Sequence, residues 1–147
     1  MQSLFSSMNQ LSNHDHSRFL SRTNRLCGAV AELDKTSADK NVDMAVMYEA
    51  ILIQMTWPGS STIYYGDEAG LCGFKDHDNR RTYQWGGENF TLIDIHRQLI
   101  RVRKNNPVLK FGSTIFLIED AGVIVYARFD KENKIVVAIT VMTIGAL

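Results

Sequence analysis

The chain has 147 residues, of which 45% are hydrophobic and 22% charged, and its 16 basic residues balance 16 acidic ones. That composition is typical of a globular protein long enough to bury a substantial core. A net charge of zero argues against nucleic acid or an anionic membrane as the main partner.

The sequence shows no basic leader, no apolar run of signal-peptide length and no stretch of about 18 apolar residues. We therefore expect a cytoplasmic chain, although a domain of a secreted parent has the same features. Cys27 and Cys72 are too few for a disulfide framework and form no Cys-x-x-Cys pair, so we interpret both as packing or half-exposed thiols. No loop of regularly spaced aspartates occurs, and we predict no calcium site, other metal or cofactor.

The first half of the chain predicts a strand near Met8, a helix over residues 37–57 and a short strand over residues 62–65. Capping residues open the helix, and Pro58-Gly59 ends it. Its second half is apolar nearly all round, so we expect it to be buried. The apolar positions at helical spacing are Val42, Val46, Ala50 and Ile53.

Residues 70–89 predict a long loop, because they carry four glycines, many charges and few periodic apolar positions. A second helix follows, with Thr91-x-x-Asp94 as a capping box and Pro107 as its stop. Its predicted apolar face is Leu92, Ile95, Leu99 and Val102. From Phe111 onward, three β-rich runs separated by Asp-Ala-Gly and Asp-Lys-Glu-Asn turns indicate an antiparallel meander.

The alternation of strands and helices in the first part implies parallel strands with crossover helices. Two such units do not close a sheet, and a barrel of eight needs about 250 residues. We therefore expect the chain to begin late in a larger architecture.

The segment "SNHDHSRFL" places His14 and Asp15 after an extended approach. On its own, this short pair favours a polar turn at a strand end over a site. Three motifs in order change that interpretation: "SNHDHSRFL", "WPGSSTIYYGDEAGLCGFKDHDNRRTYQW" and "LIRVRKNNPVLKFGS". Together they resemble the alpha-amylase superfamily of glycoside hydrolases, and "GDEAGL" with "DHDNRR" is most similar to its neopullulanase, cyclomaltodextrinase and maltogenic amylase branch.

The resemblance implies an α/β fold followed by antiparallel β structure. Residues 1–107 correspond to the last β/α units of a (β/α)8 barrel, and residues 108–147 to the beginning of a partial β-sandwich domain. Because the carboxyl ends of parallel barrel strands gather on one face, we expect Asp15 to lie near residues 66–68.

Retaining glycosidases need a nucleophilic carboxylate and an acid/base carboxylate about 5 to 5.5 Å apart. In the family these residues follow the fourth and fifth barrel strands, which the resemblance places upstream of this chain. Asp15 matches the third acidic residue, which stabilises the transition state by binding ring hydroxyls. His14 matches the neighbouring histidine that donates to the same sugar, and Asn13 either orients this pair or forms a turn.

Asp76 and Arg80 match an aspartate and an arginine that reach the sugar one subsite further from the cleaved bond. A salt bridge within the loop is an equally good interpretation of these two residues. His77 stands where the family usually has proline, so the loop is less restricted here.

Several neighbouring residues are interpreted as structural or surface groups. Arg18 is expected to be a buried ion-pair partner, His16 to be at the surface, and Asp67-Glu68 to be structural. We place the aromatic residues beside the glycine turns in the core: Tyr64, Tyr65 and Trp85. The segment 22–41 is longer than in compact family members, so we expect either an extra loop over the site or a mobile loop.

Three functional hypotheses follow from these motifs. The chain is part of an amylase-type glycosidase acting on α-glucans or maltooligosaccharides and inactive alone, a non-catalytic carbohydrate-binding or assembly module, or a truncation with no role of its own. The meander has about three strands and leaves open edges, so we also expect a homo-oligomer formed through exposed sheet edges.

Overall fold

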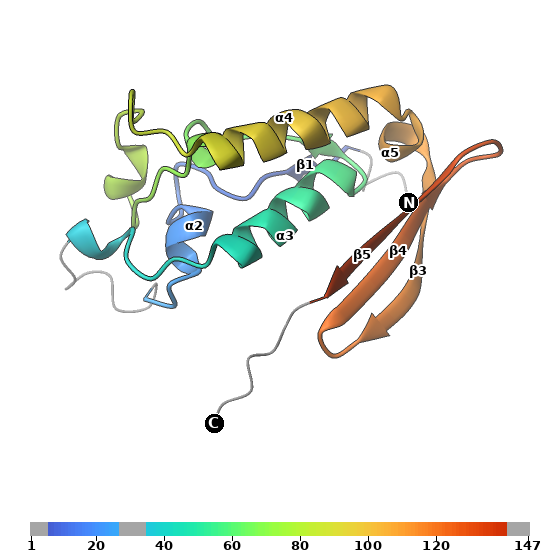
Figure 1. The fold of residues 1–147 in the computed structure, drawn as a ribbon, viewed down its shortest axis with the longest axis horizontal. Coiled ribbons are helices and arrows are strands. Elements are labelled where there is room, and N and C mark those ends of the chain that lie inside the picture. Colours follow the sequence, from blue (N-terminus) through green and yellow to red (C-terminus); the bar gives the residue numbers. More distant parts are fainter. Residues whose placement is uncertain (1–5, 27–34, 141–147) are drawn as a thin grey trace.

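The computed structural model describes residues 6–26 and 35–140. Helices pack beside a short parallel strand pair, and a three-stranded antiparallel sheet lies against one end of this group (Figure 1). The elements in chain order are β1 (Met8–Asn9), α2 (Phe19–Arg22), η1 (Lys35–Ser37), α3 (Met44–Thr56), β2 (Ser60–Ser61), η2 (Asp67–Ala69), η3 (Asp78–Arg80), α4 (Phe90–Asn105), α5 (Val108–Phe111), β3 (Ser113–Asp120), β4 (Val123–Phe129) and β5 (Lys134–Thr140).

The strands β1 and β2 pair in parallel, with Met8 opposite Ser60, and α3 precedes β2 along the chain. The predicted parallel pairing is therefore confirmed. The predicted strand over residues 62–65 is wrong, because β2 ends at Ser61. Beyond Ser61, Thr62 N still donates to Asn9 O over 2.9 Å, but the next carbonyl groups accept from side chains: Gln54 Nε2 donates to Thr62 O over 2.7 Å, and Arg18 donates to Tyr65 O.

Helix α3 begins later than the sequence predicts. Residues 35–37 form the separate 3-10 turn η1, and the helix starts after Asp43, whose carboxylate accepts from the backbone N–H groups of Ala45 and Val46. Its end before Pro58 is as predicted. The predicted apolar face is wrong in part, because Ile53 is exposed and the side chains that face the core are Met47, Ala50, Ile51, Gln54 and Met55.

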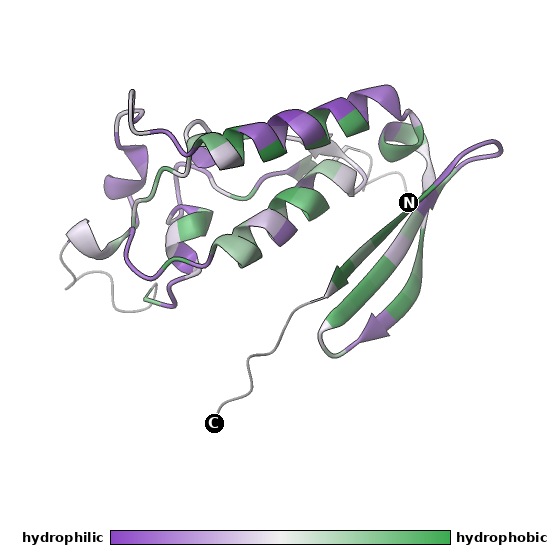
Figure 2. Cartoon of the chain, in the orientation of Figure 1, coloured by the Kyte–Doolittle hydropathy of each residue, from purple (hydrophilic) through white to green (hydrophobic). Residues whose placement is uncertain are grey.

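Helix α4 begins at Phe90, and its cap is Asn89, whose side-chain oxygen accepts from Leu92 N over 3.1 Å. The predicted capping box is therefore wrong: Asp94 pairs with Arg97 on the helix surface instead. The apolar face is correct except at its last position, because Val102 is exposed. Figure 2 shows hydrophobic and hydrophilic residues alternating along α4, as expected for a helix with one buried face.

The main core lies between α2, α3, α4 and the loop that follows η2. Its largest fully buried apolar residues are Phe74, Met47, Met55, Ile51 and Leu92. Leu20 is also buried, and Ile95 and Leu99 pack against this core. This core holds the loops that follow β1 and β2 against the helices.

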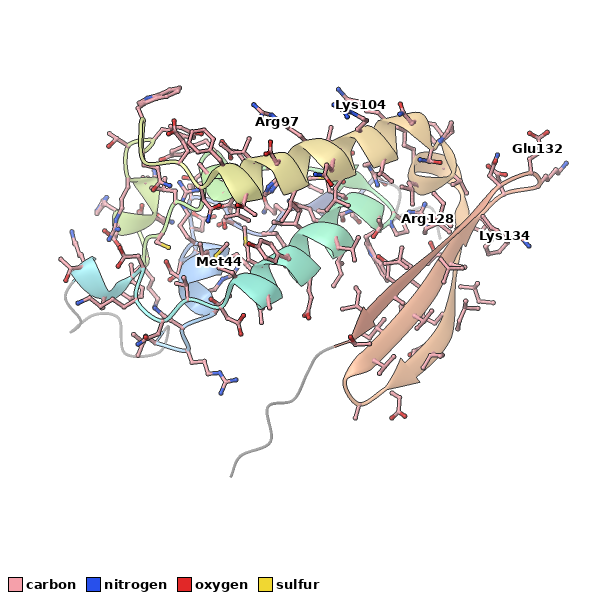
Figure 3. The ribbon with its side chains drawn as sticks, viewed as in Figure 1. Met44, Arg97, Lys104, Arg128, Glu132 and Lys134 are labelled. Carbon is pink, nitrogen blue, oxygen red and sulfur yellow. The ribbon has the colours of Figure 1, made fainter. Side chains whose placement is uncertain are left out.

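The strands β3, β4 and β5 form an antiparallel sheet in that order, as the sequence predicts. One face packs against the end of α3, where the rings of Trp57 and Tyr126 meet edge to face at 5.4 Å. Arg128 lies where the sheet meets the helices (Figure 3) and donates to Thr56 O and Leu109 O. The opposite face is apolar and exposed, with Val136 57% exposed.

Candidate functional site in the loops after the parallel strands

The His14-Asp15 pair lies in a turn that follows β1. The side-chain oxygen of Asn13 accepts from the backbone N–H groups of Asp15 and His16 over 2.9 and 3.1 Å, which is the hydrogen-bonding pattern of an Asx turn. Of the two roles predicted for Asn13, the structure shows this turn-forming one. His14 Nε2 lies 3.3 Å from Asp15 Oδ1, and their side chains are 62% and 67% exposed.

A second segment is bonded to this turn through Asn79, which is fully buried. Its Nδ2 donates to His14 O and His16 O, each over 2.8 Å, and lies 3.3 Å from Asn13 O. The buried Asn79 side chain therefore fixes the backbone around His14 and Asp15, while the side chains of these two residues face solvent. The sequence analysis did not identify Asn79. The one available signal was its position as an uncharged polar residue inside the charged run "DHDNRR", which is consistent with a structural hydrogen-bonding role.

Asp76 and Arg80 lie beside the turn. Arg80 Nε is 2.5 Å from Asp76 Oδ1, so the predicted salt bridge within the loop is present. Arg80 Nη2 also donates to His14 O over 3.5 Å. The structure thus brings together all four residues that the sequence assigns to the site. Both partners of the ion pair are partly exposed, so their polar atoms remain open to a ligand.

Arg18 connects the loops beneath the site. It is fully buried, and its Nη1 lies 3.1 Å from Asp67 Oδ1 while its Nε donates to Asn79 O over 2.8 Å. Its guanidinium carbon lies 4.2 and 4.6 Å from the ring centroids of Tyr64 and Tyr65. The prediction of a buried ion-pair partner is confirmed.

Asp67 is a structural residue, as predicted. Burial raises the pKa of this carboxyl, and the Ser12 hydroxyl and the Arg18 guanidinium act in the opposite direction. A buried carboxylate bonded to arginine is not free to act on a sugar. His16 is exposed, which also agrees with the sequence-based interpretation.

Comparison with known proteins agrees with this geometry. Residues 1–106 match the family model of the alpha amylase catalytic domain. The chain belongs to the alpha-amylase family. Curated relatives include an amylopullulanase of Thermoanaerobacter thermohydrosulfuricus, 35% identical over 96% of this chain and 10% of its own length. A cyclomaltodextrinase of Thermoanaerobacter pseudethanolicus is 33% identical over 89% of this chain and 20% of its own length, so the chain spans a tenth to a fifth of these two relatives.

Solved structures of this family share the fold. A debranching enzyme from Nostoc punctiforme superposes with a TM-score of 0.73 at 30% identity, over 90% of this chain and 24% of that protein. An alpha-amylase from Geobacillus thermoleovorans, complexed with acarbose, superposes with a TM-score of 0.74 at 26% identity. This match covers 91% of this chain and 27% of that protein. The predicted fold class, barrel β/α units followed by an antiparallel sheet, is confirmed. A domain boundary between residues 107 and 108 stays a prediction.

Two aromatic residues of this alpha-amylase family member lie where the sequence did not predict them. Trp85 is 84% exposed and Tyr65 is also exposed, so their assignment to the core is wrong. The Tyr65 hydroxyl donates to Arg81 O over 2.9 Å, across the loop. Trp85 lies just before Gly86-Gly87 and packs on the neighbouring Tyr83 rather than on the core.

Within residues 6–26 and 35–140, no group of three His, Cys, Asp or Glu side chains is arranged to hold a metal ion. The same ranges contain no helix with the length and apolar character to cross a membrane. Cys72 is buried and free, and burial raises the pKa of its thiol. Cys27 and much of the predicted extra loop lie outside the described residues.

Proposed function

We propose that this chain is part of a retaining glycosidase that acts on α-glucans or maltooligosaccharides, and that it supplies sugar contacts to the active site. Asp15 is the transition-state stabiliser and His14 the neighbouring donor. The observation that carries the proposal is the His14–Asp15 pair, which is solvent-facing although Asn13 and Asn79 fix the backbone on both sides of it. The names of the relatives, amylopullulanase and cyclomaltodextrinase, support the α-glucan substrate class.

The residue types suit this chemistry. An ionised carboxylate accepts two sugar hydroxyls at once, and an imidazole N–H donates to a third oxygen. Such contacts strengthen in the oxocarbenium-like transition state and supply several kcal/mol. In the proposal, Asp76 and Arg80 bind the next sugar along the chain, and their ion pair holds the guanidinium in place before the substrate arrives.

This chain is expected to be inactive alone. A retaining mechanism needs a nucleophile and an acid/base, which the family motifs place after barrel strands that this chain does not match. Asp67 is no substitute, because it is buried against Arg18. We therefore expect no hydrolysis of starch, pullulan or cyclodextrin, and turnover that Asp15→Asn abolishes would contradict this. A non-catalytic carbohydrate-binding module is the alternative, since it needs only the sugar contacts.

Isothermal titration of the chain with maltoheptaose tests the site. Asp15→Asn keeps the shape of the side chain but removes its charge, so we expect binding to weaken about tenfold or more. Asp94→Asn is the matched control, because Asp94 is an equally exposed aspartate with its own arginine partner on α4. Equal affinities for the wild type and Asp15→Asn would refute the proposed contact between Asp15 and the sugar.

We also propose that the chain self-associates through the β3–β5 sheet. The face turned away from the helices carries exposed Ile115, Ile118 and Val136, and Figure 2 shows hydrophobic residues along most of these three strands. A two-fold dimer that covers this face is the simplest arrangement, because like faces then meet.

A further inference from the structure

The most exposed large hydrophobic residue that the structure describes is Trp85, 84% of which is open to solvent. Its ring lies 4.6 Å from the ring of Tyr83, between centroids, with an interplanar angle of 49°. Tyr83 and Trp85 are separated by one residue, Gln84, in the loop that leads into α4. A large aromatic side chain left in water is informative, because burying it is among the strongest stabilising effects available to a protein.

The turn that carries this aromatic pair is held in place at several points. Gln84, between the two aromatic residues, donates from its side chain to Ala69 O over 2.6 Å, and Asn89 N donates to the same carbonyl over 2.9 Å. Gly87 N closes the turn on Gln84 O over 2.9 Å. A Cβ added to Gly86, the residue after Trp85, would meet nothing within 4 Å, so the space beside Gly86 is open. The pair is thus an exposed surface on an anchored loop.

Two carboxylates belong to the segments that hold this loop: Glu68 precedes Ala69, whose carbonyl accepts from Gln84, and Glu88 follows Gly87. Partial burial and the negative charges of Glu68 and Glu88 raise the pKa of the Tyr83 hydroxyl. Aromatic faces next to carboxylate acceptors complement a sugar, whose ring faces are C–H surfaces and whose rim carries hydroxyl donors.

We propose that Tyr83 and Trp85 form a stacking platform for an α-glucan chain, separate from the His14–Asp15 pair. The ligand class rests on the proposed function, whereas the platform rests on the exposed rings and their neighbouring acceptors. A neutral polyhydroxylated ligand fits better than a protein surface, because the aromatic pair is small and flanked by two carboxylates. Trp85 follows Arg80 by five residues, so at most about 18 Å separates them along the backbone. A maltooligosaccharide of several sugars spans that distance and can contact both.

Tryptophan fluorescence tests the platform directly. The chain has two tryptophans, and Trp57 packs against Tyr126, so Trp57→Phe leaves Trp85 as the only tryptophan while keeping an aromatic ring at position 57. Titration of this variant with maltoheptaose is expected to shift the emission of Trp85 to shorter wavelength, because stacking removes water from the indole. An emission spectrum that stays unchanged at saturating sugar would overturn the proposal.

Affinity measurements on the full chain supply the second readout. Trp85→Ala is expected to weaken maltoheptaose binding about three- to tenfold, and Trp85→Phe to retain most of it, because a stacked ring contributes through its face. Phe111→Ala is the matched control, since Phe111 is also highly exposed but lies on α5. Equal losses for Trp85→Ala and Phe111→Ala would refute a specific platform.

The two proposals fail in different ways. If the platform is wrong, Asp15→Asn weakens binding while the Trp85 emission does not respond to sugar. If the role of Asp15 is wrong, the Trp85 emission responds and Asp15→Asn binds as the wild type does. A chain that neither binds maltoheptaose nor changes its emission overturns both.

Discussion

Replacing Arg18 by methionine is expected to be the most damaging single substitution beneath the site. The guanidinium is fully buried and donates to Asp67, Asn79 and Tyr65. Methionine fills similar space but leaves the Asp67 carboxylate buried without its cation. Breaking a buried pair in this way costs about 3 to 5 kcal/mol, which is a large share of the roughly 5 to 15 kcal/mol that stabilises a typical domain.

The loss should depend on pH, because burial already raises the pKa of Asp67 and removal of Arg18 raises it further. An acid whose folded-state pKa lies above its unfolded value of about 3.9 stabilises the fold below that value. This stability is lost as the pH rises through the folded pKa. We therefore expect Arg18→Met to be closer to the wild type at pH 4.5 than at pH 7.5.

Urea unfolding followed by far-UV circular dichroism at these two pH values measures the effect. The double variant Arg18→Met/Asp67→Asn removes the uncompensated charge and should recover part of the loss at pH 7.5. Arg97→Met is the matched control: Arg97 pairs with Asp94 at the surface, and Figure 3 shows its side chain directed away from the core, so we expect a loss of about 0 to 1 kcal/mol. A loss of equal size at both pH values, or no recovery in the double variant, would refute the reasoning.

Three further predictions concern the frame around the site and the sheet. Asn89→Ala should lower the free energy of unfolding by about 1 kcal/mol through loss of the α4 cap, and Thr91→Ala should not, as urea titration will show. Gly66→Ala should cost more than Gly86→Ala in the same assay: both have positive φ, but a Cβ at Gly66 would lie 2.7 Å from Leu71 Cδ2 whereas Gly86 is open. Sedimentation equilibrium at micromolar concentration should detect a dimer that Val136→Asp dissociates, and a wild-type monomer would contradict the proposed self-association.

Local signals in the sequence were sufficient for much of the architecture. Proline and glycine set the ends of α3 and α4, because these residues do not continue a helix at that point. The short polar turns between apolar β-rich runs predicted the meander, since turn chemistry depends on adjacent residues. The motifs around Asp15 and Asp76 also identified four residues that the structure brings together, although it does not test their role.

Other features depended on which of several possible partners a side chain reaches in the folded chain. The start of α4 was misassigned because Thr91 and Asp94 match a capping pattern, whereas the side chain that reaches the free N–H groups belongs to Asn89. Beyond the end of β2 at Ser61, the side chains of Gln54 and Arg18 bind the carbonyl groups of Thr62 and Tyr65. The periodicity of apolar residues does not predict these hydrogen-bond partners.

The same distinction applies to the site. The sequence by itself determined which residue types are present, a carboxylate beside an imidazole and an arginine four residues after an aspartate. Only the tertiary structure decided that Asn79 holds the His14 backbone and that the ring of Trp85 faces water. Burial and hydrogen bonding are properties of the packed chain, because the free energy of a polar or aromatic group depends on the atoms that surround it.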